Sequence, residues 1–505
     1  MKQATLTGRV YVQQNGLQKG IAGVSISNGE LVVETDANGR YTLPLPEAEG
    51  VIFLTKPAEY ELPLNGYNQP QFFHFIRPEG SPNNTELEHE GFAPTPLPET
   101  VDFELLPGKK QDRFRTVFFG DIQPKTEEEV GFFQQLMVQH LIHQPMDFFV
   151  PLGDIAWDGL ALYPQLREAL SGIGKPYYTV CGNHDINLKA SDPAFSRETF
   201  QRYFVPTYYA FDYGEVHFVV LDDIGYTGWD KANNTSGITQ GYLSDRQLDW
   251  LRNDLATVAE DKLVVLLMHI PIYTDILPAD TYRNIQNRDD LFDTLSHRKK
   301  VLALAAHTHF VEHVDLRNAG WSGDGIFQHL VCGAACGAWW KGPRGWSGLP
   351  VRLGMDGTPN GFWVFDFDGN TYNYRFQAAG LPAHEQVGLR APMNGTLSAC
   401  TDGEEVVANI YAASYEAVVT CQIDDSVPLP MERTVVKDPL VLYFLEQYAD
   451  DYTHWIKPRD CAHLWKAPLP DDLEPGVHTL TVLALEPDGR RTTGKHSFSF
   501  GDRNE

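Results

Sequence analysis

The sequence holds 505 residues, of which 42% are hydrophobic and 21% charged, so we expect a globular protein and exclude a disordered or fibrous chain. A formal net charge of −27 argues against a nucleic-acid scaffold or a protein bound to an anionic membrane. No stretch approaches the roughly 18 apolar residues of a membrane-spanning helix. The six cysteines include no CxxC pair, which disfavours a disulfide framework and a thiolate zinc site.

The first region, 1–107, begins with strand-like alternation over 5–14 and not with the apolar segment of a secretory signal. We therefore expect a cytoplasmic protein, or an exported one if a signal was trimmed from the chain. Further short strands at 23–27 and 39–43, separated by Gly, Asn and Asp turns, predict a small β-sandwich. An irregular, Pro- and Asn-rich stretch over 63–98 precedes a last strand at 101–106.

The middle region, 114–380, alternates buried strand-like runs with amphipathic segments, which is typical of an α/β layered core. The expected strands are 115–120, 147–152, 176–181, 217–221, 263–268 and 301–306. Helices are expected at 127–143 and 244–258, the second with Ser244 as its N-cap. The last region, 381–505, returns to short strands around one helix at 439–448, which predicts a second β-sandwich-like domain.

Side chains that can bind metals follow the buried runs of the middle region. They are Asp121, Gln123, Asp154, Asp158, Asn183, His184, Asp185, His269, His307 and His309. Because ligand sites in α/β sheets form at the carboxyl ends of strands, we expect these residues to converge. Carboxylate, amide and imidazole ligands together favour Mn, Fe or Zn.

The order of these motifs resembles the calcineurin-like metallophosphoesterase superfamily. The matching segments are Asp121-Ile-Gln123, Gly153-Asp-Ile-Ala-Trp-Asp158, Gly182-Asn-His-Asp185, His269 and Ala306-His-Thr-His309. The resemblance implies an α/β fold with a central β-sandwich covered by helices (αββα layers), flanked here by two all-β sandwich-like domains. The flanks look like modules of a bacterial branch of the family, the first of them a carboxypeptidase-regulatory-like sandwich.

The resemblance also implies two divalent or trivalent metal ions, Mn, Fe or Zn. Asp121, Gln123 and His309 would hold the first ion, Asp154 would bridge both, and Asn183, His269 and His307 would complete the second. A hydroxide between the metals would attack phosphorus. His184 would protonate the leaving oxygen or stabilise the developing charge, and Asp185 would orient the His184 ring.

Two residues depart from the family pattern. Gln123 stands where the family has His, which should weaken the first metal site or favour a harder ion such as Mn. Ala306 stands where the family has Gly, so a Cβ occupies a tight position. Asp158 either orients metal ligands or fixes its own loop. Asp222 and Asp223 are interpreted as a solvated strand end, in preference to a third metal site.

A glycine-rich segment over 333–360 carries aromatic and basic side chains. We predict that it binds substrate through Trp339, Trp340, Arg344, Trp346 and Arg352. The alternative interpretation is a hydrophobic seal against the last domain.

These observations predict a hydrolase of a phosphate ester, mono- or diester, acting on a small phosphorylated substrate without nucleic acid or membrane insertion. The alternative is a non-catalytic protein that binds glycans or proteins, built on a degraded phosphoesterase core. In that interpretation Gln123 is a sign of the degradation, whereas retention of the other candidate ligands and of His184 favours the enzyme.

Overall fold

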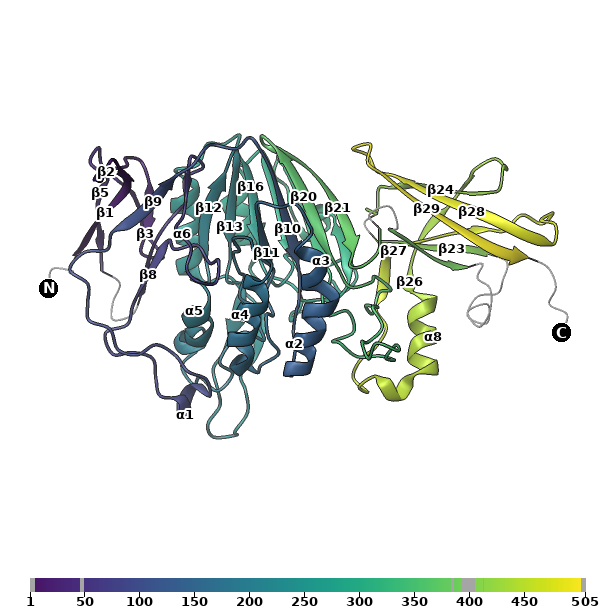
Figure 1. The fold of residues 1–505 in the computed structure, drawn as a ribbon, viewed down its shortest axis with the longest axis horizontal. Helices are drawn as coiled ribbons and strands as arrows, with labels where there is room; N and C mark the ends of the chain where they lie inside the picture. Colours follow the sequence, from purple (N-terminus) through teal and green to yellow (C-terminus); the bar gives the residue numbers. More distant parts are fainter. Residues whose placement is uncertain (1–4, 46–49, 383–385, 392–404, 412, 501–505) are drawn as a thin grey trace.

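The computed structural model describes residues 5–45, 50–382, 386–391, 405–411 and 413–500. Figure 1 shows the N-terminal strands at one end of the molecule, the central sheets in the middle and the C-terminal strands at the other end. The predicted mixed α/β fold is confirmed. Within the described ranges, the helices are too short or too polar to cross a membrane.

The N-terminal part consists of two small sheets. One has the order β2-β1-β9-β7 with β5 also paired to β1, and contains β1 (Thr5–Gln14), β2 (Leu17–Gly20), β5 (Arg40–Pro44), β7 (Tyr60–Glu61) and β9 (Phe103–Pro107). The other is β4-β3-β6-β8, with β3 (Ser25–Ser27), β4 (Val32–Glu34), β6 (Gly50–Leu54) and β8 (Phe73–Ile76). Alternate residues of β1 are buried, as the sequence pattern predicts. The stretch expected to be irregular contains β8 and a short helix, α1 (Asn84–Leu87).

Two sheets form the central part. The first is β11-β10-β20-β21, from β10 (Arg113–Phe119), β11 (Phe148–Pro151), β20 (Gly361–Asp368) and β21 (Thr371–Ala378). The second is β12-β13-β16-β17-β19-β18, from β12 (Tyr209–Tyr213), β13 (Val216–Val220), β16 (Leu263–Leu267), β17 (Lys300–Ala305), β18 (Val311–Val314) and β19 (Ile326–Cys332). β14 (Ile224–Tyr226) and β15 (Thr239–Gly241) form a separate hairpin. Because β10 and β11 are parallel, as are β13, β16, β17 and β19, the carboxyl ends within each set share one edge.

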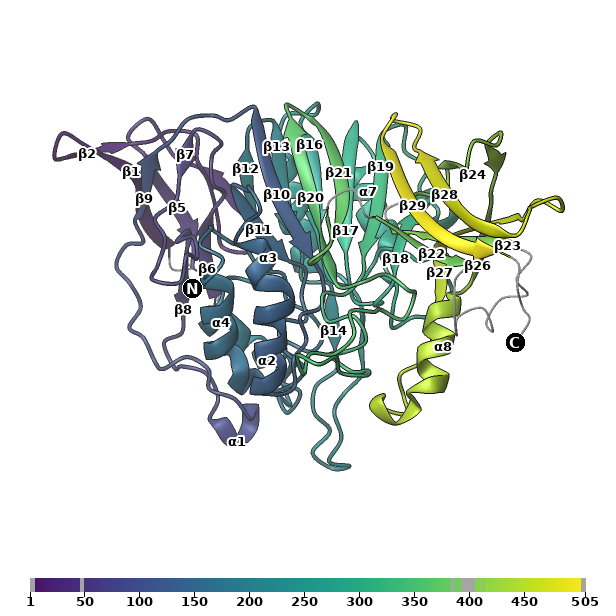
Figure 2. The same ribbon diagram turned by 45° about the vertical axis from the view of Figure 1, so that its right-hand side comes forward.

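Helices accompany the central sheets. They are α2 (Glu127–Phe133), which continues through a π-helical turn (η1, Gln134–Val138) into α3 (Gln139–Leu141), then α4 (Tyr163–Ser171), α5 (Glu198–Tyr203), α6 (Asp245–Leu255) and α7 (Arg288–Leu295). Figures 1 and 2 show α2 and α4 side by side beside β10 and β11. Ser244 caps α6, because its Oγ accepts a hydrogen bond from the Gln247 N–H, as predicted.

The run 176–181, expected to be a strand, is not one. It makes a single β-bridge, between Phe149 and Tyr177. Pro176 has no N–H to donate, and the Thr179 N–H donates to the Tyr209 hydroxyl at 3.1 Å and not to a strand. The prediction of burial was right, and the run still pairs with β11, because the N–H groups of Tyr178 and Val180 donate to the Phe149 and Pro151 carbonyls at 3.2 Å.

The C-terminal part holds two four-stranded sheets. These are β22-β23-β27-β26 and β25-β24-β28-β29, made of β22 (Val387–Ala391), β23 (Glu405–Ile410), β24 (Val418–Ile423), β25 (Leu429–Pro430), β26 (Glu432–Lys437), β27 (Asp460–Pro468), β28 (Gly476–Leu485) and β29 (Arg491–Phe500). Both sheets contribute to one apolar core around Trp465 and Leu480. The predicted helix is present as α8 (Pro439–Gln447), which Asp438 caps.

Candidate metal centre

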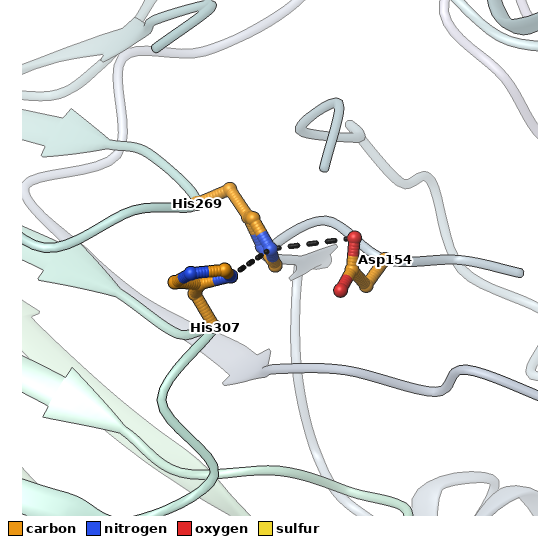
Figure 3. A group of neighbouring side chains, drawn as sticks. All are labelled: Asp154, His269 and His307. Atoms are coloured by element: carbon orange, nitrogen blue, oxygen red, sulfur yellow. Dashed lines mark hydrogen bonds and ion pairs between the residues drawn. The ribbon is translucent and has the colours of Figure 1, made fainter. Parts of the chain in front are cut away.

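The predicted metal-binding residues follow the strands of both central sheets. Asp121 lies two residues beyond β10, Asp154 three beyond β11, His269 two beyond β16, and His307 two beyond β17. The structure brings Asp154, His269 and His307 together, with one ligand atom of each within 4.8 Å of the others (Figure 3). All three side chains are buried.

The orientation of His269 indicates a cation site. Its Nδ1 lies 2.8 Å from the Leu152 carbonyl, which only accepts, so Nδ1 carries a proton and Nε2 is the ring atom that faces the centre. That Nε2 lies 3.3 Å from Asp154 Oδ1, 3.1 Å from Asn183 Oδ1 and 3.2 Å from His307 Nδ1. The Asn183 oxygen faces this point because the Asn183 amide N–H donates to the Tyr282 hydroxyl at 2.9 Å. Such a convergence of acceptors is stable only around a positive charge.

Beside this group lies a second set of buried acceptors. Asp121 Oδ2 accepts the His307 backbone N–H at 3.0 Å, while Asp121 Oδ1 lies 3.5 Å from His309 Nε2. The Gln123 amide donates to Asp154 Oδ2 at 2.9 Å. Asp121 Oδ1 and Gln123 Oε1 have no hydrogen-bond partner among the described residues. Buried oxygens left without a partner, on residues next to the His309 ring and to Asp154, fit a second cation.

Burial sets the protonation of the candidate ligands. It lowers the pKa of His309 to about 3 and that of His307 well below its usual value, so both rings are neutral at pH 7. Burial also raises the pKa of Asp121 well above its usual value, so a nearby cation is needed to keep it ionised. Burial lowers the pKa of His269 too, but Asp154 outweighs it and raises that pKa to about 10. The centre therefore attracts positive charge, as a proton or as a metal ion.

The backbone is strained at these residues. Positive φ angles occur at Asp121 (25°), Gln123 (48°), Asp154 (49°), His307 (65°) and His309 (59°). Residues other than Gly, Asn and Asp rarely adopt such values, so the strain falls mainly on Gln123, His307 and His309, and strain of this kind concentrates at functional sites. The strained backbone lowers the stability of the fold and directs these side chains into the centre.

Ala306, which stands where the family has Gly, is accommodated because the residue next to it in space is Gly120. A Cβ built on Gly120 would lie 2.5 Å from the Ala306 Cβ, so the two positions share one small space. The methyl group of Ala306 fits because Gly120 has none. The presence of Ala at position 306 therefore leaves room for the His307–His309 turn.

The predicted partner of the His184 ring is wrong. Asp158, not Asp185, contacts the ring, with Asp158 Oδ1 2.6 Å from His184 Nδ1. Asp185 is buried and accepts from the backbone N–H groups of Gly182, Ile155 and Ala156 and from the Tyr163 hydroxyl; these contacts hold its carboxylate among the loops. Asp158 thus orients the His184 ring, a role that was not among the two considered for it.

The interpretation of Asp223 is also wrong, because its side chain is fully buried. Its Oδ2 accepts from the backbone N–H groups of His269 and Ile270, at 3.0 and 2.7 Å. Asp223 therefore fixes the turn that presents His269. Asp222 pairs with Arg197 at 3.1 Å and is not a free strand end either.

Part of the segment 333–360 forms the hydrophobic seal that was the alternative interpretation of it. Trp340 is buried, and its indole N–H donates to the Ile122 carbonyl at 2.7 Å, which anchors the loop beneath the centre. Ala338, Leu353 and Met355 pack with Val441 of α8 in a small apolar core. These contacts seal the central part against the C-terminal part.

The other predicted substrate-binding residues lie in different surroundings. Trp339 stacks on His309 with ring centroids 4.0 Å apart. Arg344 pairs with Glu128 of α2, and Arg352 donates to the Ala379 carbonyl at 2.5 Å. Trp346 is fully exposed at 102%. Of these, the structure brings Trp339 alone into ring contact with a candidate metal ligand.

Sequence reasoning missed Tyr282, Trp157, Trp455 and Lys125. Tyr282 holds Asn183 and packs against the His307 ring at 4.7 Å. Trp157 lies inside the Gly153–Asp158 motif, which was a signal that could have identified it. No motif marks Tyr282 or Trp455, which come from a loop and from the C-terminal part.

We expect that Gln123 is a working ligand and not a relic. Gln123→His should tighten Mn binding at the first site or change the metal preference, whereas Gln123→Ala should weaken binding by about 10- to 100-fold. Titration of the metal-free parent and of both variants with Mn and Zn measures the metal affinity and the metal preference. Identical affinity and selectivity in the parent and the two variants would exclude Gln123 from the ligand set.

Family comparisons agree with this arrangement. A family model described as "Calcineurin-like phosphoesterase" matches residues 114–311. Models described as the N terminal and the C terminal of calcineurin-like phosphoesterase match residues 4–90 and 329–491. Together the three matches cover most of the chain, and the central match contains the candidate ligands.

Individual relatives match a smaller part of the chain than the family models do. The chain is 29% identical over 179 residues to a probable glycerophosphodiester phosphodiesterase of Arcobacter nitrofigilis, a match over 35% of this chain and 61% of that protein. It is 26% identical over 172 residues to a 3′,5′-cyclic-nucleotide phosphodiesterase of Nostoc, over 32% of this chain and 56% of that protein. The chain thus spans less than two thirds of the length of these relatives.

A solved structure of the purple acid phosphatase PPD1 from yellow lupin seeds also matches. Its TM-score is 0.36 at 14% identity, covering 74% of this chain and 66% of that one.

Proposed function

The chain belongs to the calcineurin-like phosphoesterase family, and from that premise we propose that it hydrolyses a phosphate ester of a small molecule at a two-metal centre. The observation that carries the proposal is the convergence of Asp154, Asn183 and His307 on Nε2 of His269. Relatives named as phosphodiesterases favour a diester as the first candidate substrate. The net charge of −27 favours a small substrate over a nucleic acid.

The donors present fit two metal ions. Asp121, Gln123 and His309 would hold the first, Asn183, His269 and His307 the second, and Asp154 lies between the two sets. Mixed oxygen and nitrogen donors of this kind suit Mn, Fe or Zn. When bound, the ions would supply Lewis acidity and a nucleophile derived from water.

The side chains of the protein perform the proton transfer. His184 donates its Nδ1–H to Asp158, which leaves Nε2 free to deliver a proton to the leaving oxygen. Burial lowers the pKa of His184, but Asp154 and Asp158 outweigh it and raise that pKa, which favours the protonated ring before the reaction. The backbone N–H of His184 also donates to Asp154 Oδ1 at 2.9 Å, which fixes the acid relative to the metal ligands.

A substrate panel tests the proposal. Purified protein loaded with Mn is incubated with bis(p-nitrophenyl) phosphate, p-nitrophenyl phosphate and a set of alkyl diesters, and bound metal per chain is measured in parallel. We expect close to two ions per chain, turnover of the diester, and loss of turnover after chelation. No bound metal and no turnover of any ester would reject the enzyme in favour of a binding protein.

A further inference from the structure

Three tryptophans from distant parts of the chain meet beside the candidate centre. Trp157 follows β11, Trp339 lies between β19 and β20, and Trp455 follows α8 in the C-terminal part. The ring centroids of Trp339 and Trp455 are 4.8 Å apart, those of Trp157 and Trp455 are 5.2 Å apart, and those of Trp157 and Trp339 are 6.2 Å apart. We call these three rings the tryptophan wall.

We propose that the tryptophan wall binds the leaving group of the substrate, and that this group is planar and apolar and carries no positive charge. The inference rests on the proposed phosphoesterase function and specifies its substrate class. It also makes the C-terminal part a contributor to specificity, through Trp455.

The position of the wall assigns it to the leaving group. The Trp157 ring lies 5.0 Å from the ring of His184, the candidate acid, and the Trp339 ring stacks on the candidate ligand His309 at 4.0 Å. The wall therefore extends from the metal ligands to the proton donor. The group attached to the oxygen that His184 protonates must lie on the same side as His184, and hence against these rings.

The chemistry of the wall selects a planar, apolar group. Tryptophan faces bind aromatic and apolar surfaces, and they also attract cations. Here the cation position is already taken, because the Lys125 ammonium lies 3.6 Å from the Trp157 ring centroid and 5.4 Å from that of Trp455. The close contact between the rings leaves no cage for a quaternary ammonium, and the Lys125 charge repels one.

Exposure distinguishes the wall from the apolar seal nearby. Trp455 is 36% exposed, and Trp157 and Trp339 are partly exposed, whereas Trp340 of the same segment is 3% exposed. A purely structural tryptophan would be buried as Trp340 is, without this exposure beside the centre.

Binding of phosphonates tests the wall without depending on turnover. Calorimetry on Mn-loaded protein compares 2-naphthylmethylphosphonate, methylphosphonate and 2-(trimethylammonio)ethylphosphonate. We expect the parent to prefer the naphthyl compound to the methyl compound, and Trp455→Ala to reduce this preference by about 3- to 10-fold with little change for methylphosphonate. Trp455→Phe should retain most of the preference. Lys125→Gln should improve binding of the trimethylammonium compound.

Val427→Ala is the control, because Val427 is an apolar residue of the C-terminal part, as Trp455 is, and is exposed; it should bind all three compounds as the parent does. If Trp455→Ala melts at a lower temperature and both Trp455 variants keep the full naphthyl preference, the wall is a structural seal and the inference is wrong. A parent that hydrolyses esters but binds naphthyl and methyl phosphonates equally also overturns the wall and leaves the function intact. A parent that discriminates between them but hydrolyses no ester contradicts the proposed function and supports the wall as a binding surface.

Discussion

Asp154→Asn is expected to release bound metal and to reduce ester hydrolysis by more than about 10²-fold, which is the upper end of the effect of residues that only orient a ligand. Asp154 stands between the two sets of donors, with Oδ1 3.3 Å from His269 Nε2 and Oδ2 2.9 Å from the Gln123 amide. The substitution removes a negative charge that both cations would share. Metal per chain after Mn loading and dialysis, together with the hydrolysis rate, measures the two effects.

Asp249→Asn is a suitable control for this experiment, since Asp249 is an exposed residue of α6 and its removal changes the net charge by the same amount. It should keep both metal and rate. Asp223→Asn offers an intermediate case, because Asp223 holds the His269 backbone without facing the centre. If Asp154→Asn binds metal and hydrolyses esters as the parent does, the two-metal proposal is wrong.

The elements that position the centre were predictable because their signals are local. Continuous apolar runs such as 263–267 identify strands buried on both faces, and the polar residues that follow them mark the strand ends. Ser244 and Asp438 mark helix starts in the same local way. The ordered motifs then placed the candidate ligands at one edge, where the structure has them.

What could not be predicted depends on how loops turn. Asp185 neighbours His184 in sequence, yet its carboxylate faces three backbone N–H groups, while Asp158, 26 residues earlier, reaches the ring. The run 176–181 has the composition of a strand and donates two backbone hydrogen bonds to β11, but the Thr179 N–H donates to a side chain and the run forms only a β-bridge. The approach of Trp455 depends on the packing of α8 against the segment 333–360, and no periodicity in the sequence encodes that packing.

The second large effect is expected at His184. His184→Ala should lower the rate by about 10²- to 10⁴-fold on esters with alkyl leaving groups, which need a proton, and by much less on p-nitrophenyl esters, which do not. Metal content should stay near that of the parent, because the His184 side chain contacts Asp158 and Trp157 and lies outside the two donor sets. Hydrolysis rates on a series of esters whose leaving groups increase in pKa show how strongly the rate depends on the leaving group.

Two aspartate variants show whether this dependence belongs to the His184 ring or to the loop that carries it. Asp158→Asn should reproduce the leaving-group dependence in weaker form, because it removes the charge that orients the ring and favours its protonation. Asp185→Asn should instead lower the melting temperature and slow all esters alike, because Asp185 holds the backbone of residues 155, 156 and 182. If His184→Ala slowed activated and unactivated esters equally, or lost its metal, His184 would act on the centre itself and the proton to the leaving oxygen would have to come from another group.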